Sequence, residues 1–232
     1  LVARCRTVAL SPKGFRPQKE VIAELYRIGL PAIVMQSLAT FMTLGLNKIM
    51  ALFSSSAVFI LGAYFKIQSF IFMPVHGLNN GMIPVVGYNY GARHRARITG
   101  LTRFALCIAV VIMAAGTLFL LCLPGFFLAL FNAEPEVLAA GVPALRMIAL
   151  SFPFAGVSIV LCAVLQAVGE SLRSLAVSLA RQILLVLPAA LALGLLAPER
   201  MWLCFLLSEL LSCGLALLLY RQICRQKLSR LS

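Results

Sequence analysis

The feature that most constrains this chain is a series of apolar segments, each long enough to cross a lipid bilayer as a helix. An α-helix rises about 1.5 Å per residue, so about 20 apolar residues span the hydrocarbon core. Hydrophobic residues make up 62% of the 232 residues and charged residues only 12%, whereas a soluble domain is about one quarter charged. We therefore expect an all-α integral membrane protein and not a soluble fold.

Six such segments are predicted to span the membrane. They are residues 28–52, 57–90, 99–123, 142–167, 172–196 and 201–220. A basic segment, 1–27, precedes them, and part of it near Lys19–Arg27 is expected to form a short surface helix. A basic tail, 221–232, follows them. The second span exceeds the hydrocarbon thickness, so it must tilt, kink or extend past the membrane.

The positive charge of the chain is placed at the ends of the apolar segments. A net charge of +13 is compatible with nucleic-acid binding, but arginines at span ends are typical of topology signals and of contacts with anionic lipid headgroups. If the six spans alternate in direction, one side of the membrane carries sixteen Lys and Arg and the other side three. By the positive-inside rule both termini are predicted to be cytoplasmic, with membrane lipid as a partner and no nucleic acid.

Residues 77–97 combine glycines, amides and tyrosines with a run of arginines at the end. Asn79, Asn80, Tyr88 and Asn89 would be costly to expose to lipid tails, because hydrocarbon offers no hydrogen-bond partner. These side chains are therefore expected to face protein or a water-filled cavity. Two interpretations remain: a kinked helix that only packs against its neighbours, or one wall of a solute pathway.

Polar side chains also recur along the first span. Gln36, Thr40, Thr43 and Asn47 follow one another at intervals of four, three and four residues, which places them on one helix face. A polar stripe on a membrane helix is expected to point away from lipid, either toward a cavity or toward hydrogen bonds with adjacent helices. In the second span Tyr64 and Gln68 lie four residues apart and can share a face.

Two ionisable residues lie deep in predicted spans. Lys66 is about nine residues into the second span, and Glu209 is near the midpoint of the sixth. An ionisable residue inside a membrane is a functional candidate by default, for ion coupling or as a buried charge. The alternative for Lys66 is a structural partner such as a helix carbonyl or a distant Glu. For Glu209 it is a contact with a neighbouring helix or with Lys66.

Enzymatic motifs are absent from the sequence. It contains no HExxH, P-loop or GxSxG pattern, no clustered His or Cys, two His and no Asp. The seven cysteines form no CxxC pair and are expected to be small buried hydrophobes. We therefore expect that the protein is not an enzyme and that it binds no cofactor or metal. An ion gradient is a more plausible source of energy for it than a nucleotide.

The chain also carries a series of ordered motifs. They begin with Gly29-Leu30-Pro31 and Asn47-Lys48 and continue with Lys66-Ile-Gln68-Ser-Phe-Ile-Phe-Met-Pro74. Gly77-Leu-Asn-Asn-Gly-Met-Ile-Pro84, Gly87-Tyr-Asn-Tyr-Gly91-Ala-Arg and Gln166-Ala-Val-Gly169 complete the set. Together these motifs strongly resemble those of the multidrug and toxic compound extrusion (MATE) family of bacterial efflux antiporters. The resemblance covers essentially the whole chain and is most specific over residues 28–97.

The resemblance implies a fold of six transmembrane helices forming one lobe, the C-terminal one, of a twelve-helix, two-lobed transporter. Its partner would be the missing N-terminal lobe or a second copy of the chain. Family members export cationic or amphipathic compounds in exchange for protons or sodium, so the implied location is the bacterial inner membrane. By resemblance, the cavity wall would include Gln36, Asn47, Gln68, Asn79 and Tyr88.

The sequence departs from the family pattern at the positions where some family members carry acidic residues for the coupling ion. Some sodium-coupled branches carry an acidic residue in the first helix of this lobe and another in the fourth. Here the corresponding positions, around Ala39 and Ser151–Ser158, are apolar or hydroxylic. Other branches place the coupling acid in the N-terminal lobe.

Two other functions remain as alternatives to the antiporter. A lipid-linked saccharide flippase of related architecture would favour several deep Arg or Lys for pyrophosphate, and Lys66 is the only one predicted here. A non-transporting membrane scaffold or partner subunit is the other alternative.

Overall fold

The computed structural model of the chain describes residues 18–231, which form helices joined by short turns and contain no strand. The basic residues predicted between positions 1 and 17 lie outside the described residues. The helices that open the chain are α1 (Lys19–Ala51), α2 (Ser55–Gly91), α3 (Arg95–Cys122), α4 (Pro124–Leu130), α5 (Pro135–Ala149) and α6 (Phe152–Ala167). They are followed by α7 (Ser171–Leu179), the π-helix η2 (Ala180–Leu185), α8 (Val186–Leu196), the 3₁₀-helix η3 (Pro198–Arg200), α9 (Leu203–Gln226) and the 3₁₀-helix η4 (Leu228–Leu231).

Five helices of the described residues are long and apolar enough to cross a membrane. They are Gly29–Ala51, Ser55–Gly91, Arg95–Cys122, Ser171–Leu196 and Leu203–Gln226. A sixth crossing is reached if α5 and α6, which are bent by 44° relative to each other, count as one span. The predicted surface helix near Lys19–Arg27 is not a separate element, because these residues are the first turns of α1.

The predicted fourth span, 142–167, is divided in two. The break follows Ala149, and Pro153 stands at the second position of α6. Pro153 has no N–H to donate to the carbonyl of Ala149 four residues earlier. The Thr117 hydroxyl of α3 donates to that carbonyl instead, at 2.9 Å. Pro153 lies within the predicted span, and the structure shows that the helix bends between α5 and α6.

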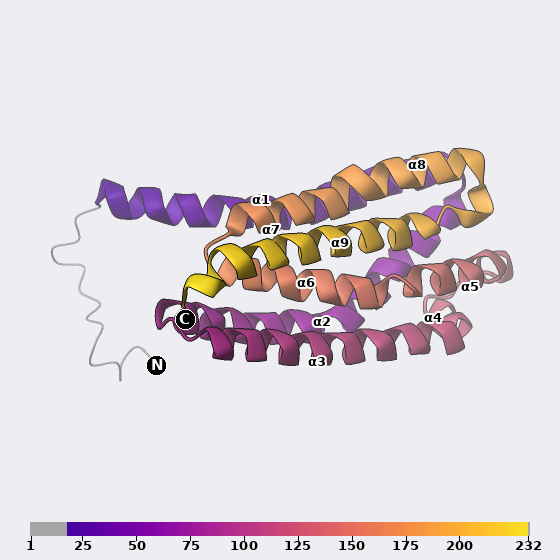
Figure 1. The fold of residues 1–232 in the computed structure, drawn as a ribbon. Helices are drawn as coiled ribbons and strands as arrows, with labels where there is room; N and C mark the ends of the chain where they lie inside the picture. The colour runs from indigo at the N-terminus through magenta and orange to yellow at the C-terminus, as the bar shows by residue number, and fades with distance from the viewer. Residues whose placement is uncertain (1–17, 232) are drawn as a thin grey trace, which may run out of the picture.

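The long helices run roughly along one bundle, with α4 and α5 at one end (Figure 1). The turns α2–α3 and α6–α7 and the C-terminus share the opposite end (Figure 1). An ion pair between Glu170 of the α6–α7 turn and Lys227 at the end of α9 joins two of these segments. Gly169 forms that turn with a φ of +80°, a conformation that glycine adopts without steric cost. Successive spans therefore alternate in direction.

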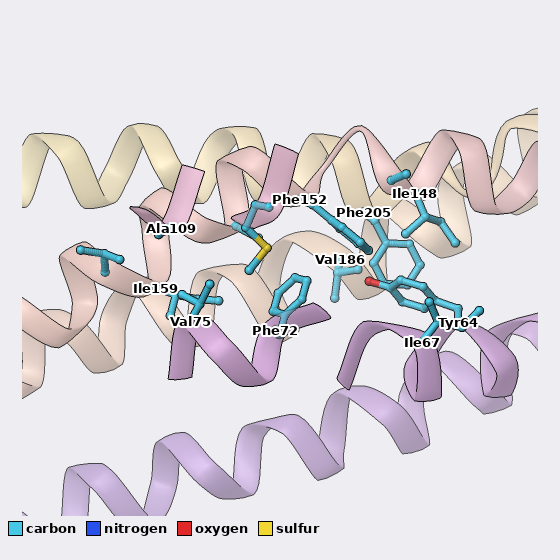
Figure 2. Packing of buried hydrophobic residues seen from close by; sticks show 14 of the residues in the cluster. Tyr64, Ile67, Phe72, Val75, Ala109, Ile148, Phe152, Ile159, Val186 and Phe205 are labelled. Carbon is cyan, nitrogen blue, oxygen red and sulfur yellow. The ribbon is translucent and has the colours of Figure 1, made fainter. Parts of the chain in front are cut away.

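The bundle is organised around α6, which packs against α2, α3, α7 and α9. Its side chains are buried on nearly all sides, so α6 forms the centre of the lobe. Figure 2 shows the core where α2 meets Phe152 of α6 and Phe205 of α9. The Tyr64 ring centroid lies 5.0 Å from that of Phe205, and the Phe72 centroid lies 5.2 Å from that of Phe152, both edge to face. Such aromatic contacts fix the packing of α2 on α6 and α9.

Large apolar side chains also cover the outside of the bundle. On α1 and α3 these include Leu30, Ile33, Phe41, Leu44, Phe104, Val111 and Leu118, all exposed. A soluble monomer rarely presents so continuous an apolar surface, whereas a helix in lipid requires one.

Candidate functional site

A groove with polar walls enters the bundle between α1, α2, α6, η2 and α9. It consists of two adjacent hollows, of about 420 Å³ and 260 Å³, that share His76, Ile159, Arg181 and Gln182. We call the two hollows together the polar groove. The first hollow is also lined by Ala39, Met42, Gln68, Ser69, Phe72, Met73, Val186, Phe205, Ser208 and Glu209. The second is also lined by Ala32, Met35, Gln36, Asn79, Asn80, Ile83, Ser158, Cys162, Ala163, Gln166 and Ser178.

One face of α2 forms a continuous wall of the polar groove. Gln68, Phe72, His76, Asn79 and Asn80 follow one another at helical spacing, so their side chains lie on the same side of the helix. Tyr64, one helical turn before Gln68, is instead buried in the core, as is Ile67. The part of α2 that lines the groove therefore begins at Gln68.

The charged centre of the first hollow is an ion pair between η2 and α9. Arg181 Nη1 lies 3.7 Å from Glu209 Oε1, and the two side chains are 21% and 14% exposed. A tight guanidinium–carboxylate pair has contacts of about 2.7–2.9 Å and is frequently bidentate, so this pair is loose. Glu209 Oε2 is buried, and within the described part of the chain it has no hydrogen-bond partner.

The backbone that carries Arg181 is a π-helix. Pro188 follows η2 and has no N–H to donate to the carbonyl of Leu184, and irregular helix near proline is common. Ser208 of α9 donates its hydroxyl to the Arg181 carbonyl at 2.6 Å, which ties η2 to α9 next to Glu209. Single π-turns inside α-helices are frequent at functional sites because they redirect side chains.

Amides and hydroxyls make up seven of the fifteen residues that line the second hollow. Asn79 donates to the carbonyl of Ile159 on α6 at 3.3 Å, while its Oδ1 atom is buried and has no partner among residues 18–231. Gln166 donates to the Ser174 hydroxyl at 3.0 Å, joining α6 to α7. The second hollow therefore keeps an unused acceptor beside Arg181.

Five of the sequence-predicted residues line the polar groove. They are Gln36, Gln68, Asn79, Asn80 and Glu209, contributed by α1, α2 and α9.

Of the polar stripe predicted on α1, only Gln36 lines the groove. Thr40 lines only a shallow hollow made by α1 itself. Thr43 donates to the Ala39 carbonyl and Asn47 to the Thr43 carbonyl, so both bond to their own helix.

Three predicted residues lie elsewhere. Tyr64 is 1% exposed and belongs to the aromatic core, which separates it from Gln68 despite their spacing. Tyr88 is exposed near the end of α2 and lines none of the hollows described above. Lys66 is not a buried charge: it is exposed, and its Nζ lies 5.4 Å from the centroid of the Phe131 ring. Glu209 is paired with Arg181 and not with Lys66.

Sequence analysis missed the partner of Glu209. It counted Lys66 as the only deep cation, although Arg181 also lies inside a predicted span, 172–196. The sequence does contain a signal for Arg181: it lies inside an apolar segment, where an arginine is energetically costly unless it pairs with an acidic residue. His76 and Ser208 carried no distinctive spacing.

The composition of the first hollow suits amphipathic ligands. Phe72 and Phe205 offer aromatic faces, and Met42 and Met73 offer flexible apolar side chains that adapt to ligands of different shape. A carboxylate, a guanidinium and two amides, Gln68 and Gln182, provide polar contacts in the same space. Among the residues that the structure describes, no group of three or more His, Cys, Asp or Glu could hold a metal ion.

Comparison with known proteins gives one family. The family model of MatE matches residues 31–191. The multidrug export protein MepA of Staphylococcus aureus strain bovine RF122 / ET3-1 is 26% identical over 230 residues, which are 96% of this chain and 49% of that protein. MepA of strain MSSA476 is 27% identical over 169 residues, which are 70% of this chain and 36% of that protein. The chain thus spans about half the length, or less, of the relatives that it matches.

Solved structures give the same fold. A MATE protein crystallised in complex with MaL6 superposes with a TM-score of 0.88 at 20% identity, over 99% of this chain and 52% of that one. An outward-facing multidrug resistance transporter of the MATE family superposes with a TM-score of 0.86 at 19% identity, over 97% and 50% of the two chains. The chain is therefore a multi-pass membrane protein that belongs to the MatE family and covers about one lobe of a MATE transporter.

Proposed function

We propose that this chain is one half of a secondary transporter that exports cationic or amphipathic drugs in exchange for protons or sodium. The other half would be an N-terminal lobe or a second copy of the chain. The similarity to multidrug export proteins supports efflux, and the polar groove supports recognition of an amphipathic cation. Transport by rocking of two lobes is a general mode of secondary transporters with repeated halves.

The observation that carries this proposal is the position of Glu209. It is a largely buried carboxylate in a membrane helix, it lines a hollow, and its one contact with Arg181 leaves its other oxygen without a partner within the described residues. A carboxylate in such surroundings is costly unless a cation neutralises it. A proton, a sodium ion or a cationic drug can each supply that neutralisation, and competition between them would couple export to an ion gradient.

The basic end of the bundle is proposed to face the cytoplasm of a bacterial cell, with the protein in the inner membrane. Arg93, Arg95 and Arg97 at the α2–α3 turn lie at the same end as Lys227 and the C-terminus (Figure 1). Positive residues favour the cytoplasmic side of a membrane.

A lipid-linked saccharide flippase is less well supported. Recognition of a pyrophosphate would favour several cations in the groove. Arg181 is the one Lys or Arg among the described residues that lines it, and Arg181 is already paired with a carboxylate.

The experiment is dye efflux from cells that lack their own drug pumps. The full-length protein containing this chain is expressed, cells are loaded with ethidium, and efflux is followed after energisation. We expect efflux from the wild type, and a loss of at least tenfold in rate for Glu209→Gln at equal membrane abundance. Glu136→Gln is the matched control, because Glu136 is exposed in the first turn of α5, away from the groove.

Ethidium retention that is unchanged by expression of the wild type would contradict the proposed efflux. Wild-type rates in Glu209→Gln would contradict the role of Glu209 while leaving efflux itself in place.

A further inference from the structure

The proposed cation site contains a cation of its own. Resting on the proposed function, we propose that the Arg181 guanidinium is a tethered occupant of the Glu209 carboxylate, which an organic cation must displace in order to bind. Arg181 would then act as an internal competitor, setting both the affinity of the site and its preference for ligands that can replace a guanidinium.

The geometry of the pair permits displacement. The two groups approach through a single 3.7 Å contact, Arg181 Nη1 to Glu209 Oε1. The second carboxylate oxygen, Oε2, has no hydrogen-bond partner among residues 18–231. Oε2 is also buried, so a ligand cation reaches it only when the Glu209 side chain turns toward the hollow, and it then meets no competing hydrogen bond. A bidentate pair would leave no oxygen for such an approach.

The groove also offers the displaced guanidinium a second position. Arg181 lines both hollows, and the second hollow contains Asn79, whose buried Oδ1 has no donor within the described residues. A guanidinium has five N–H donors and no acceptor, so it pairs readily with an amide oxygen. Gln36 and Gln166 line the same hollow and provide further carbonyl oxygens.

The hydrogen bond that holds the backbone of Arg181 does not involve its guanidinium. The Ser208 hydroxyl bonds to the Arg181 carbonyl at 2.6 Å, and that carbonyl lies in the π-helix η2. Movement of the guanidinium therefore requires only rotation of the side chain, with no change in the helix. Exchanging one cation for another at Glu209 also avoids leaving a bare carboxylate in a low-dielectric site.

The ligand class follows from the side chains around Glu209. Phe72 and Phe205 line the first hollow together with Met42 and Met73. Aromatic faces bind organic cations, and the apolar lining binds their hydrophobic part. The site is therefore suited to a monovalent lipophilic cation.

The experiment measures binding of tetraphenylphosphonium to the full-length protein in lipid nanodiscs by equilibrium dialysis. Arg181→Gln is expected to bind the cation about tenfold more tightly than the wild type, because the apparent affinity of a site falls with the fraction of it already occupied. Glu209→Gln is expected to lose binding, and the double variant to behave like Glu209→Gln. Arg146→Gln, which removes a cation whose Nε bonds to the Leu121 carbonyl outside the groove, is expected to leave the affinity unchanged.

Tetraphenylborate, an anion of the same shape, separates the alternatives. Wild-type binding of the anion that is abolished in Arg181→Gln would make Arg181 itself the ligand-binding group and would overturn the proposal. Cation affinity that is unchanged or weaker in a folded Arg181→Gln, with binding still lost in Glu209→Gln, would overturn the tethered competitor but not the cation site. Binding retained in Glu209→Gln would overturn the cation site and, with it, this proposal. Thermal unfolding of each variant identifies those that are folded, and Arg181→Met serves if Arg181→Gln is not.

Discussion

The Ser208 hydroxyl of α9 donates a 2.6 Å hydrogen bond to the carbonyl of Arg181 in η2. This bond joins a π-turn to the helix that carries Glu209, one residue after Ser208. The position of the Arg181–Glu209 pair therefore depends on a bond from a side-chain hydroxyl of α9 to the backbone of η2, and not only on the two charges.

Replacing Ser208 by alanine removes this contact. We expect Ser208→Ala to lower the free energy of unfolding by about 1 kcal/mol, the size of one interhelical hydrogen bond in a membrane bundle. For a domain of this length that is a fall of about 2–4 °C in the midpoint of thermal unfolding in detergent. Ser212→Ala is the control, because the Ser212 hydroxyl bonds only within α9, to the Glu209 carbonyl. Equal midpoints for Ser208→Ala and the control would contradict a tie between η2 and α9.

The bend between α5 and α6 depends on Thr117. Its hydroxyl donates at 2.9 Å to the Ala149 carbonyl, which Pro153 leaves without a backbone donor. Thr117→Val keeps the shape of the side chain but leaves this carbonyl unpaired, at a cost of about 1–3 kcal/mol. Thermal unfolding should show the loss, whereas Thr99→Val, which removes only bonds within α3 near its start, should show little. A Thr117→Val variant as stable as Thr99→Val would show that the bend does not need this donor.

Close packing of α8 against Phe53 in the α1–α2 turn is tested at Gly194. A Cβ added there would lie 2.4 Å from Phe53 Cζ, so the Phe53 ring would have to move. Gly194→Val is expected to destabilise the chain by about 1–3 kcal/mol, which is typical of overpacking. At Gly214 on α9 an added Cβ meets nothing within 4 Å, and Gly214→Ala is expected to be neutral or stabilising. Similar unfolding midpoints for the two variants would mean that α8 and Phe53 are not in contact.

Glu170 joins the α6–α7 turn to the C-terminal end of α9. It pairs with Lys227 and, at 3.3 Å, with Arg173, and all three side chains are partly exposed. Because water and salt screen such pairs, Glu170→Gln is expected to cost only about 0.2–1 kcal/mol. The difference in unfolding midpoint from the wild type should shrink between low and high sodium chloride. A large difference that salt leaves unchanged would contradict a screened surface cluster.

Sequence patterns predicted the fold well because the bilayer limits what a long apolar segment can become. Every predicted span has a helical counterpart. The basic segments that were predicted on one side of the membrane include the α2–α3 and α6–α7 turns, which lie at the same end of the bundle (Figure 1). The break after Ala149 was harder to predict. Pro153 signals a bend, but only the position of Thr117 on α3 identifies the group that satisfies the freed carbonyl.

The candidate site was predicted less completely, because helical spacing tells which residues share a face but not what that face meets. Gln68 and Tyr64 illustrate this limit: they lie four residues apart, yet Gln68 lines the groove and Tyr64 packs against Phe205. Lys66 and Arg181 illustrate a second limit, which is that the sequence does not show which charges pair. Both are cations in apolar segments, and only the packing of η2 against α9 shows that Arg181 is the one that pairs with Glu209.

The central claim is that the groove lined by Gln36 and Gln68 is filled with water while the outer surfaces of α2 and α3 face lipid. The most direct test is labelling of single cysteines, placed in the full-length protein after its native cysteines are replaced, by a charged, membrane-impermeant methanethiosulfonate. We predict rapid labelling of Gln36→Cys and Gln68→Cys, and slow labelling of Phe70→Cys and Phe104→Cys, whose exposed side chains on α2 and α3 we expect to face lipid. Slow labelling at both glutamine positions, no faster than at the two phenylalanine positions, would contradict the account.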